Sequence, residues 1–188
     1  MTLREALEVL APELGNELVV HANGFLSRES FALADRPANF YMIGSMGLAS
    51  SIGLGLALSR PDRRVFVFDG DGNVLMNLGT LALAGALAPK NFFHLCFDNG
   101  AYASTGAQPT ISRFVRLEGV ARACGYRLAA RVDGPASLRD TFRSWRASEG
   151  PAFLLVRIDL DAEPRKLPRV EHAPSFLAER FRKEATRT

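Results

Sequence analysis

Two polar turns in this sequence carry side chains that could hold a metal ion and a phosphate group. Gly70-Asp71-Gly72-Asn73 follows the apolar run VFVFD, and Asn99 ends a second apolar run, 28 residues after Asp71. Glycines allow a tight turn and let backbone N–H groups approach an anion. One carboxylate and one amide suit Mg²⁺ when phosphate and water oxygens complete its coordination. Gly-Asp-Gly alone would be an ordinary turn, but the two turns together predict a magnesium–diphosphate site.

Two further glycine-containing turns follow predicted strands, His-Ala-Asn-Gly at 21–24 and Gly-Ser-Met-Gly at 44–47. Ligands of parallel sheets bind beyond the carboxyl ends of the strands, so all four turns should open on the same edge. The second turn could instead be a helix start capped by Ser45. His21 could carry a proton near a substrate. His94 lies inside an apolar run and is expected to be a hydrogen-bonded core residue rather than a catalytic one.

The elements that position these turns alternate between strand-like and helix-like runs. Continuous apolar runs predict parallel strands, buried on both faces, at 17–21, 39–43, 64–69, 91–98, 126–132 and 152–158. Helices are predicted at 47–59, 75–88, 112–124 and 135–148, after an amphipathic N-terminal helix. This succession predicts an α/β fold, a three-layer αβα sandwich with a mostly parallel six-stranded sheet. Residues 1–188 are expected to form one diphosphate- and metal-binding domain.

Composition narrows the class of protein. The chain has 188 residues, of which 47% are hydrophobic, enough for a sizeable core. Its net charge of +3 is too small for a nucleic-acid footprint, and its apolar runs fall short of the roughly 20 residues that cross a bilayer. Cys96 and Cys124 form no C-x-x-C pair and should be buried. The N-terminus lacks the order of a signal peptide, so we expect a cytoplasmic protein without nucleic-acid or membrane partners.

A basic tail begins at about residue 163. It carries seven Lys/Arg against four Asp/Glu, which accounts for the whole net charge. This pattern predicts a solvated amphipathic helix. The alternative is that the tail attracts an acidic ligand or an acidic neighbouring subunit.

The Gly-Asp-Gly turn and the distant Asn99 resemble the cofactor motif of thiamin diphosphate-dependent enzymes. The resemblance implies the fold of the diphosphate-binding domain of these enzymes. It also implies that Mg²⁺ is held by the side chains of Asp71 and Asn99 and by the carbonyl of Ala101. One departure is visible, because the pair often written Asn-Asn is Asp98-Asn99 here. The second residue is the one that ligates, so the implied metal site is unaffected.

The same resemblance implies the other contacts of the cofactor. Met46 would wedge beneath it and bend it, the carbonyl of Gly44 would accept a hydrogen bond from its pyrimidine amino group, and Tyr102 would form a wall. Gly72 and Asn73 would contact the diphosphate. The implied cofactor-binding residues are Gly44, Ser45, Met46, Gly70, Asp71, Gly72, Asn73, Asn99, Ala101 and Tyr102.

A partner chain is also implied. In this family a glutamate from a separate pyrimidine-binding domain activates the cofactor, and the strands predicted here leave no room for that domain. Glu29 lies near a strand end, but its setting does not match the activating glutamate. The resemblance therefore implies a separate α subunit that carries the glutamate, in an α₂β₂ assembly as the simplest symmetric arrangement.

A longer resemblance, over roughly residues 3–160, is to sulfopyruvate and phosphonopyruvate decarboxylases, and in chain length to the β subunit of the former. It is carried by 24–29, 35–37, 39–42, 44–50, 76–81, 98–102 and 104–106. It implies decarboxylation of a three-carbon anionic 2-oxo acid, 3-sulfopyruvate to sulfoacetaldehyde or the phosphonate analogue.

Arg28 would bind the terminal anion of that substrate, or would instead cap a helix or pair with Glu29 or Asp35. A carboligase and a non-catalytic cofactor-binding subunit are the alternative functions. A Mg²⁺-dependent phosphatase with Asp71 as nucleophile would need a second carboxylate and a lysine close by.

Overall fold

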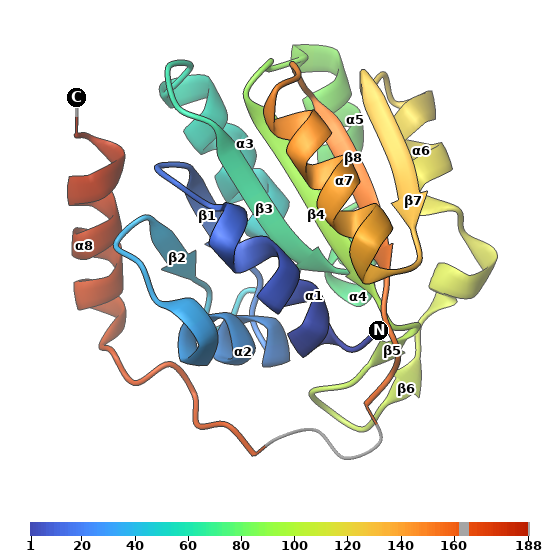
Figure 1. The fold of residues 1–188 in the computed structure, drawn as a ribbon, viewed down its shortest axis with the longest axis horizontal. Coiled ribbons are helices and arrows are strands. Elements are labelled where there is room, and N and C mark those ends of the chain that lie inside the picture. Colours follow the sequence, from blue (N-terminus) through green and yellow to red (C-terminus); the bar gives the residue numbers. More distant parts are fainter. Residues whose placement is uncertain (162–165, 188) are drawn as a thin grey trace.

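A six-stranded parallel sheet between two layers of helices forms the body of the chain (Figure 1). The computed structural model describes residues 1–161 and 166–187. The strand order is β2-β1-β3-β4-β8-β7, and each neighbouring pair is parallel. The strands are β1 (Leu18–His21), β2 (Asn39–Tyr41), β3 (Val65–Gly70), β4 (Phe92–Asp98), β7 (Leu128–Val132) and β8 (Ala152–Arg157). The predicted α/β class and six-stranded sheet are confirmed.

Helices cover both faces of the sheet. One face carries α1 (Leu3–Leu10), α2 (Phe25–Ala34) and α7 (Pro135–Arg146). The opposite face carries α3 (Ala49–Ser59), α5 (Gly79–Leu87) and α6 (Leu117–Ala123). A small antiparallel hairpin, β5 (Ala101–Tyr102) with β6 (Gln108–Pro109), extends beyond the end of β4.

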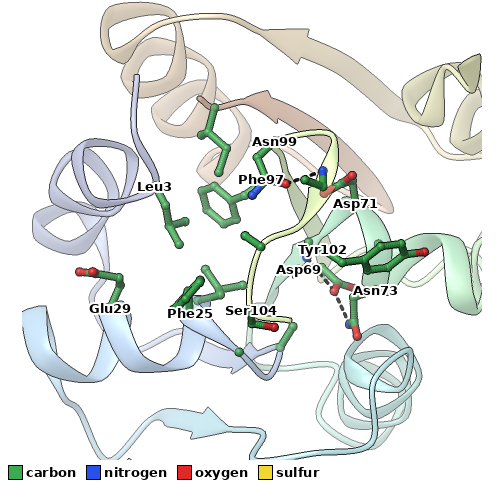
Figure 2. Close-up of a pocket in the computed structure, with 18 of the residues that line it drawn as sticks. Leu3, Phe25, Glu29, Asp69, Asp71, Asn73, Phe97, Asn99, Tyr102 and Ser104 are labelled. Carbon is green, nitrogen blue, oxygen red and sulfur yellow. Dashed lines mark hydrogen bonds between the residues drawn. The ribbon is translucent and has the colours of Figure 1, made fainter. Parts of the chain in front are cut away.

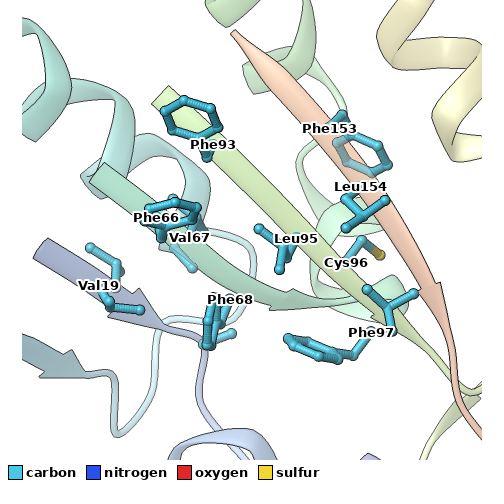
Figure 3. Close-up of a cluster of buried hydrophobic side chains, with 14 of the residues drawn as sticks. Val19, Phe66, Val67, Phe68, Phe93, Leu95, Cys96, Phe97, Phe153 and Leu154 are labelled. Atoms are coloured by element: carbon cyan, nitrogen blue, oxygen red, sulfur yellow. The ribbon is translucent and has the colours of Figure 1, made fainter. Parts of the chain in front are cut away.

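The core explains why the strand sequences are apolar without alternation. β3 and β4 lie in the middle of the sheet and are buried on both faces, so both sets of alternating side chains must be apolar. Phe66 and Phe93 stack with their ring centroids 5.0 Å apart (Figure 3), an arrangement worth about 0.5–1.5 kcal/mol beyond the buried area. Cys96 is fully buried, as predicted, and its burial raises the pKa of its thiol. Cys124 is only half-buried.

Two of the predicted helices are interrupted. The stretch predicted at 75–88 is α4 (Asp71–Met76) followed by α5, with a break at Asn77 and Leu78. The side chain of Asn77 donates hydrogen bonds to the Gly47 carbonyl and the Ser51 hydroxyl, which fixes the break. The stretch predicted at 112–124 is a 3₁₀ turn, Ile111–Phe114, and then α6. α2 was not predicted as a helix at all.

The C-terminal tail contains α8 (Pro174–Ala185), which packs at the β2 edge of the sheet (Figure 1). Phe181 contacts Phe40 with ring centroids 5.4 Å apart, and Arg180 donates hydrogen bonds of 2.7 and 2.9 Å to Asp35. The helix is therefore docked on the domain along one side. The predicted start of the tail, at about residue 163, lies outside the described residues. In the part of the chain that the structure describes, none of the helices has the length and apolar character to cross a membrane.

A close approach between α5 and the end of α6 predicts the effect of one substitution. A Cβ on Gly85 would overlap the carbonyl group of Cys124, which is backbone and cannot rotate away. We expect Gly85→Ala to lower the free energy of unfolding by about 2–3 kcal/mol, measured by urea denaturation.

Gly55→Ala is the matched control, because a Cβ at this exposed position of α3 meets no atom within 4 Å. It should raise the free energy of unfolding by about 0.5–1 kcal/mol, since alanine loses less backbone entropy in a helix. Equal effects of the two substitutions would contradict the close helix contact.

Candidate functional site

A cavity of about 200 Å³ opens beyond the carboxyl ends of β1, β3, β4 and β8 (Figure 2). Its walls come from the residues after β1, from the end of β3 and the start of α4, and from the turn after β4. Because all four strands are parallel, the residues that follow them meet at one edge of the sheet. The cavity-lining residues at these positions include Ala22, Asn23, Gly24, Asp69, Gly70, Asp71, Gly72, Asn73, Asn99, Ala101 and Tyr102.

The three residues expected to supply oxygen ligands to Mg²⁺ all line this cavity. Asp71 begins α4 and is 2% exposed, and burial raises the pKa of its carboxyl, with the nearby Asp98 carboxylate acting in the same direction. Asn99 and Ala101 line the same cavity and are joined by a 2.9 Å hydrogen bond from the Ala101 N–H to the Asn99 Oδ1. A bound cation would offset the cost of the buried negative charge at Asp71.

The composition of this donor set indicates the kind of metal. Within residues 1–161 and 166–187, no three His, Cys, Asp or Glu side chains group together as a metal cage. One carboxylate, one amide and one backbone carbonyl are hard oxygen donors that leave coordination positions for phosphate and water. The residues present therefore fit Mg²⁺ bound together with a diphosphate.

Gly72 is required by the ring of Tyr102. A Cβ at residue 72 would overlap the ring carbons of Tyr102, and both residues line the cavity. Only a glycine lets the ring lie flat against the start of α4. Tyr102 is thus placed as a wall of the cavity, where the sequence predicted it.

Asn73 holds two parts of the site together. Its Oδ1 accepts a 2.5 Å hydrogen bond from the Gly47 N–H, and its Nδ2 donates to Asp69 Oδ1 (Figure 2). The other oxygen of Asp69 lies 3.0 Å from Nε2 of His94, which is fully buried. His94 is a hydrogen-bonded core residue, as predicted. Asn73 lines the cavity, but its side-chain amide is used to tie β3 to the loop at 44–47, and its contact with a diphosphate stays a prediction.

The loop at 44–47 reaches the cavity through Met46, which is 37% exposed. Gly44 and Ser45 are exposed and are not among the cavity-lining residues. The alternative that Ser45 caps a helix is wrong, because α3 begins at Ala49 after Leu48 and has no side-chain cap. Ser45 instead adopts a left-handed backbone conformation with φ of 56°. The cofactor contacts of Gly44 and Ser45 stay predictions.

His21 is not at the cavity, so the prediction that it carries a proton there is wrong. It is the last residue of β1 and is 2% exposed, with its ring 4.9 Å from that of Tyr41 and 5.2 Å from that of Phe68. Burial lowers the pKa of His21 to about 3. Successive side chains of a strand point to opposite faces. The sequence pattern alone therefore does not say whether the side chain of His21, at the end of its strand, points into the core or toward a ligand.

Arg28 is also absent from the cavity wall. It lies on α2 with its guanidinium 5.6 Å from the centre of the Phe25 ring. The alternative pairings of Arg28 are wrong, because Glu29 pairs with Arg4 at 3.3 Å and Asp35 pairs with Arg180 at 2.7 Å. Its contact with a substrate anion stays a prediction.

Three residues of the site were not singled out from the sequence. Asp69 ends the VFVFD run, and a carboxylate at the end of a buried strand was a signal that could have been used. Thr110 and Ser112 contact the carboxylates at the end of the sheet. Their Thr-x-Ser spacing before a turn is typical of a cap, but it does not predict contacts with residues so distant in sequence.

The fold and the cavity define an α/β domain whose polar site, at the carboxyl edge of the sheet, suits a diphosphate-bearing cofactor. Residues 27–156 match the family model described as thiamine pyrophosphate enzyme, C-terminal TPP binding domain. The chain belongs to this family, and its cofactor is thiamin diphosphate, as predicted.

Two relatives and one solved structure illustrate the similarity. The β subunit of sulfopyruvate decarboxylase of Methanothermobacter thermautotrophicus is 44% identical over 169 residues, which cover 85% of this chain and 88% of that protein. Phosphonopyruvate decarboxylase of Streptomyces viridochromogenes is 45% identical over 181 residues, 94% of this chain but only 44% of that protein.

A Mycobacterium smegmatis structure described as a thiamin diphosphate-dependent enzyme superposes with a TM-score of 0.71 at 20% identity. The superposition covers 85% of this chain and 32% of the other, and it shows the shared fold. The chain thus spans less than half of the phosphonopyruvate relative and most of the β subunit.

The buried state of His21 predicts a pH dependence of stability. With a pKa of about 3 when folded and 6.5 when unfolded, the unfolded chain binds the extra proton, so stability falls as the pH drops below 6.5. Between pH 6.5 and 4.5 the wild type should lose about 2 kcal/mol more than His21→Gln, by urea denaturation at each pH. Carboxylates titrate in both proteins, so parallel pH profiles would contradict the neutral buried His21.

Proposed function

We propose that this chain is the diphosphate- and Mg²⁺-binding subunit of a two-chain decarboxylase. Its substrate is a three-carbon 2-oxo acid with a terminal anion, with 3-sulfopyruvate giving sulfoacetaldehyde and carbon dioxide as the first candidate. The observation that carries the proposal is the meeting of Asp71, Asn99 and Ala101 at one cavity. The electron sink for such a reaction is supplied by bound thiamin diphosphate.

The residues of this chain have binding and orienting roles in that reaction. Asp71 and Asn99 would hold the metal with their side chains, and Ala101 would hold it with its carbonyl. Gly72 leaves space for the Tyr102 ring, which would form a wall beside the cofactor. Met46 lines the cavity, and its flexible thioether chain would support the bound cofactor.

The match to a relative named as a β subunit supports a two-chain enzyme. The β subunit relative is matched over 88% of its length, whereas the phosphonopyruvate decarboxylase relative is about twice as long as its matched part. We infer that a separate chain supplies the pyrimidine-binding domain and the activating glutamate, in an α₂β₂ assembly.

Exposed apolar side chains around the site support a covering partner. Ile43 is 58% exposed next to the Met46 loop, and Met76, which is 59% exposed, lies at the end of α4. Ile111 and Phe114 are 58% and 75% exposed on the turn that follows the β5–β6 hairpin. Apolar side chains grouped at the rim of a polar site are typical of a protein interface.

Asp71→Asn tests the metal site. The substitution keeps the shape of the side chain but removes the charge of a metal ligand. It should weaken Mg²⁺-dependent binding of thiamin diphosphate by at least about 100-fold, because even mutating a residue that only hydrogen-bonds to a metal ligand lowers metal affinity about 10–100-fold. Calorimetric titration measures the affinity.

The fold should survive, because a buried carboxylate with a raised pKa is replaced by a neutral amide. Asp133→Asn is the matched control, because Asp133 is exposed and pairs with Arg131 at 3.0 Å, away from the cavity. Unchanged cofactor affinity in Asp71→Asn would refute the site.

The activity is tested with sulfopyruvate and phosphonopyruvate, by the chain alone and by the chain mixed with a candidate partner that carries a pyrimidine-binding domain. We expect carbon dioxide release only in the mixture, and the faster substrate identifies the terminal anion. Activity of the chain alone would refute the partner proposal. Cofactor binding in the mixture without decarboxylation would refute the reaction and favour a carboligase or a non-catalytic subunit.

A further inference from the structure

Asp98 stands where the family motif often has an asparagine, and in the structure its carboxylate is buried and hydrogen-bonded. Asp98 is 3% exposed, and its carboxylate pairs with Arg157 at 2.7 Å and accepts a 3.0 Å hydrogen bond from the Gly100 N–H. β3 and β4 are neighbours in register, so Asp98 stands beside Asp71 at the end of the sheet. Two buried carboxylates this close repel each other unless donors hold them in place.

Two hydroxyl groups connect these carboxylates. Thr110 Oγ1 lies 2.5 Å from Asp71 Oδ2, Ser112 Oγ lies 2.9 Å from Asp98 Oδ1, and the two hydroxyl oxygens are 2.9 Å apart. Each hydroxyl has one proton to donate. Thr110 therefore donates to Asp71 and Ser112 donates to Asp98, which gives each carboxylate one hydroxyl donor.

Thr110 also contacts the second turn of the metal site. Its backbone N–H donates a 2.9 Å hydrogen bond to the carbonyl of Gly100, the residue between Asn99 and Ala101. One residue thus joins the turn that carries Asp71 to the turn that carries Asn99 and Ala101. Thr110 is only 3% exposed, so water does not compete for these bonds.

We propose that Thr110 is a positioning residue for the metal, supported by Ser112, and that it fixes the Asp71 carboxylate relative to the Asn99–Ala101 turn. The inference rests on the proposed function and names the residues that orient its ligands. Groups that hydrogen-bond to metal ligands typically contribute 10–100-fold to metal affinity, because they hold each ligand in the binding orientation. Asp98, which pairs with Arg157, accepts the hydrogen bond from Ser112 and so holds Ser112 in place.

The test measures metal binding directly, with Mn²⁺ as a paramagnetic probe in place of Mg²⁺. The full chain is titrated with Mn²⁺ in the presence of thiamin diphosphate, and free Mn²⁺ is followed by electron paramagnetic resonance. Thr110→Val keeps the shape of the side chain but removes the hydroxyl, so it should weaken Mn²⁺ binding about 10–100-fold. Thr110→Ser restores the hydroxyl and should bind Mn²⁺ within about threefold of the wild type.

Two further variants separate positioning from stability. Ser112→Ala leaves the Thr110–Asp71 bond in place, so it should weaken Mn²⁺ binding less than Thr110→Val does. Thr186→Val is the matched control, since it removes a threonine hydroxyl that donates to the Arg182 carbonyl on α8, remote from the cavity. All titrations are made well below the unfolding temperature of each variant, so a loss of stability alone does not change the Mn²⁺ affinity.

The outcomes distinguish this inference from the proposed function. Wild-type Mn²⁺ affinity in Thr110→Val, or an equal loss in Thr110→Val and Thr110→Ser, overturns the positioning role while the metal site stands. A wild-type chain whose Mn²⁺ binding is not strengthened by thiamin diphosphate overturns the proposed site and the positioning role together.

Discussion

Parallel hydrogen bonding between β3 and β4 sets where the two halves of the site meet. The register runs from Val65 opposite Phe92 to Gly70 opposite Phe97, so the residues that follow, 71 and 98–99, leave the sheet side by side. A shift of one residue would turn every side chain of a strand to the other face, and both strands are buried on both faces. The packing of the apolar core therefore fixes the geometry of the polar edge.

That edge concentrates buried negative charge, which the chain stabilises in three different ways. Asp69 is held by His94 and Asn73, Asp71 by Thr110, and Asp98 by Arg157 and Ser112. The three aspartates are at most 3% exposed as residues, and a buried charge is tolerated only where donors or counter-charges surround it. The arrangement supports the proposed cation site.

Large apolar side chains are exposed close to the polar edge of the sheet. They include Met46, whose loop reaches the cavity, and Ile111 and Phe114, on the turn that follows Thr110. At the β2 edge of the sheet, α8 covers β2 through Phe181 and Arg180. The exposed apolar side chains near the cavity support the proposed partner on that side.

The sequence by itself determined the sheet and the polar positions at its edge. All six strands were predicted to within two residues, helped by the continuous apolar pattern of strands that are buried on both faces, such as β3 and β4. Asp71 and Asn99 were predicted from their types and spacing, whereas the roles of Ala101, Gly72 and Tyr102 were implied by the family resemblance. The tertiary structure alone decided the rest: it placed His21 in the core and Arg28 on a helix surface, broke two predicted helices, and brought Thr110 to Asp71. These outcomes depend on side-chain direction and on contacts between distant residues, which local sequence patterns do not encode.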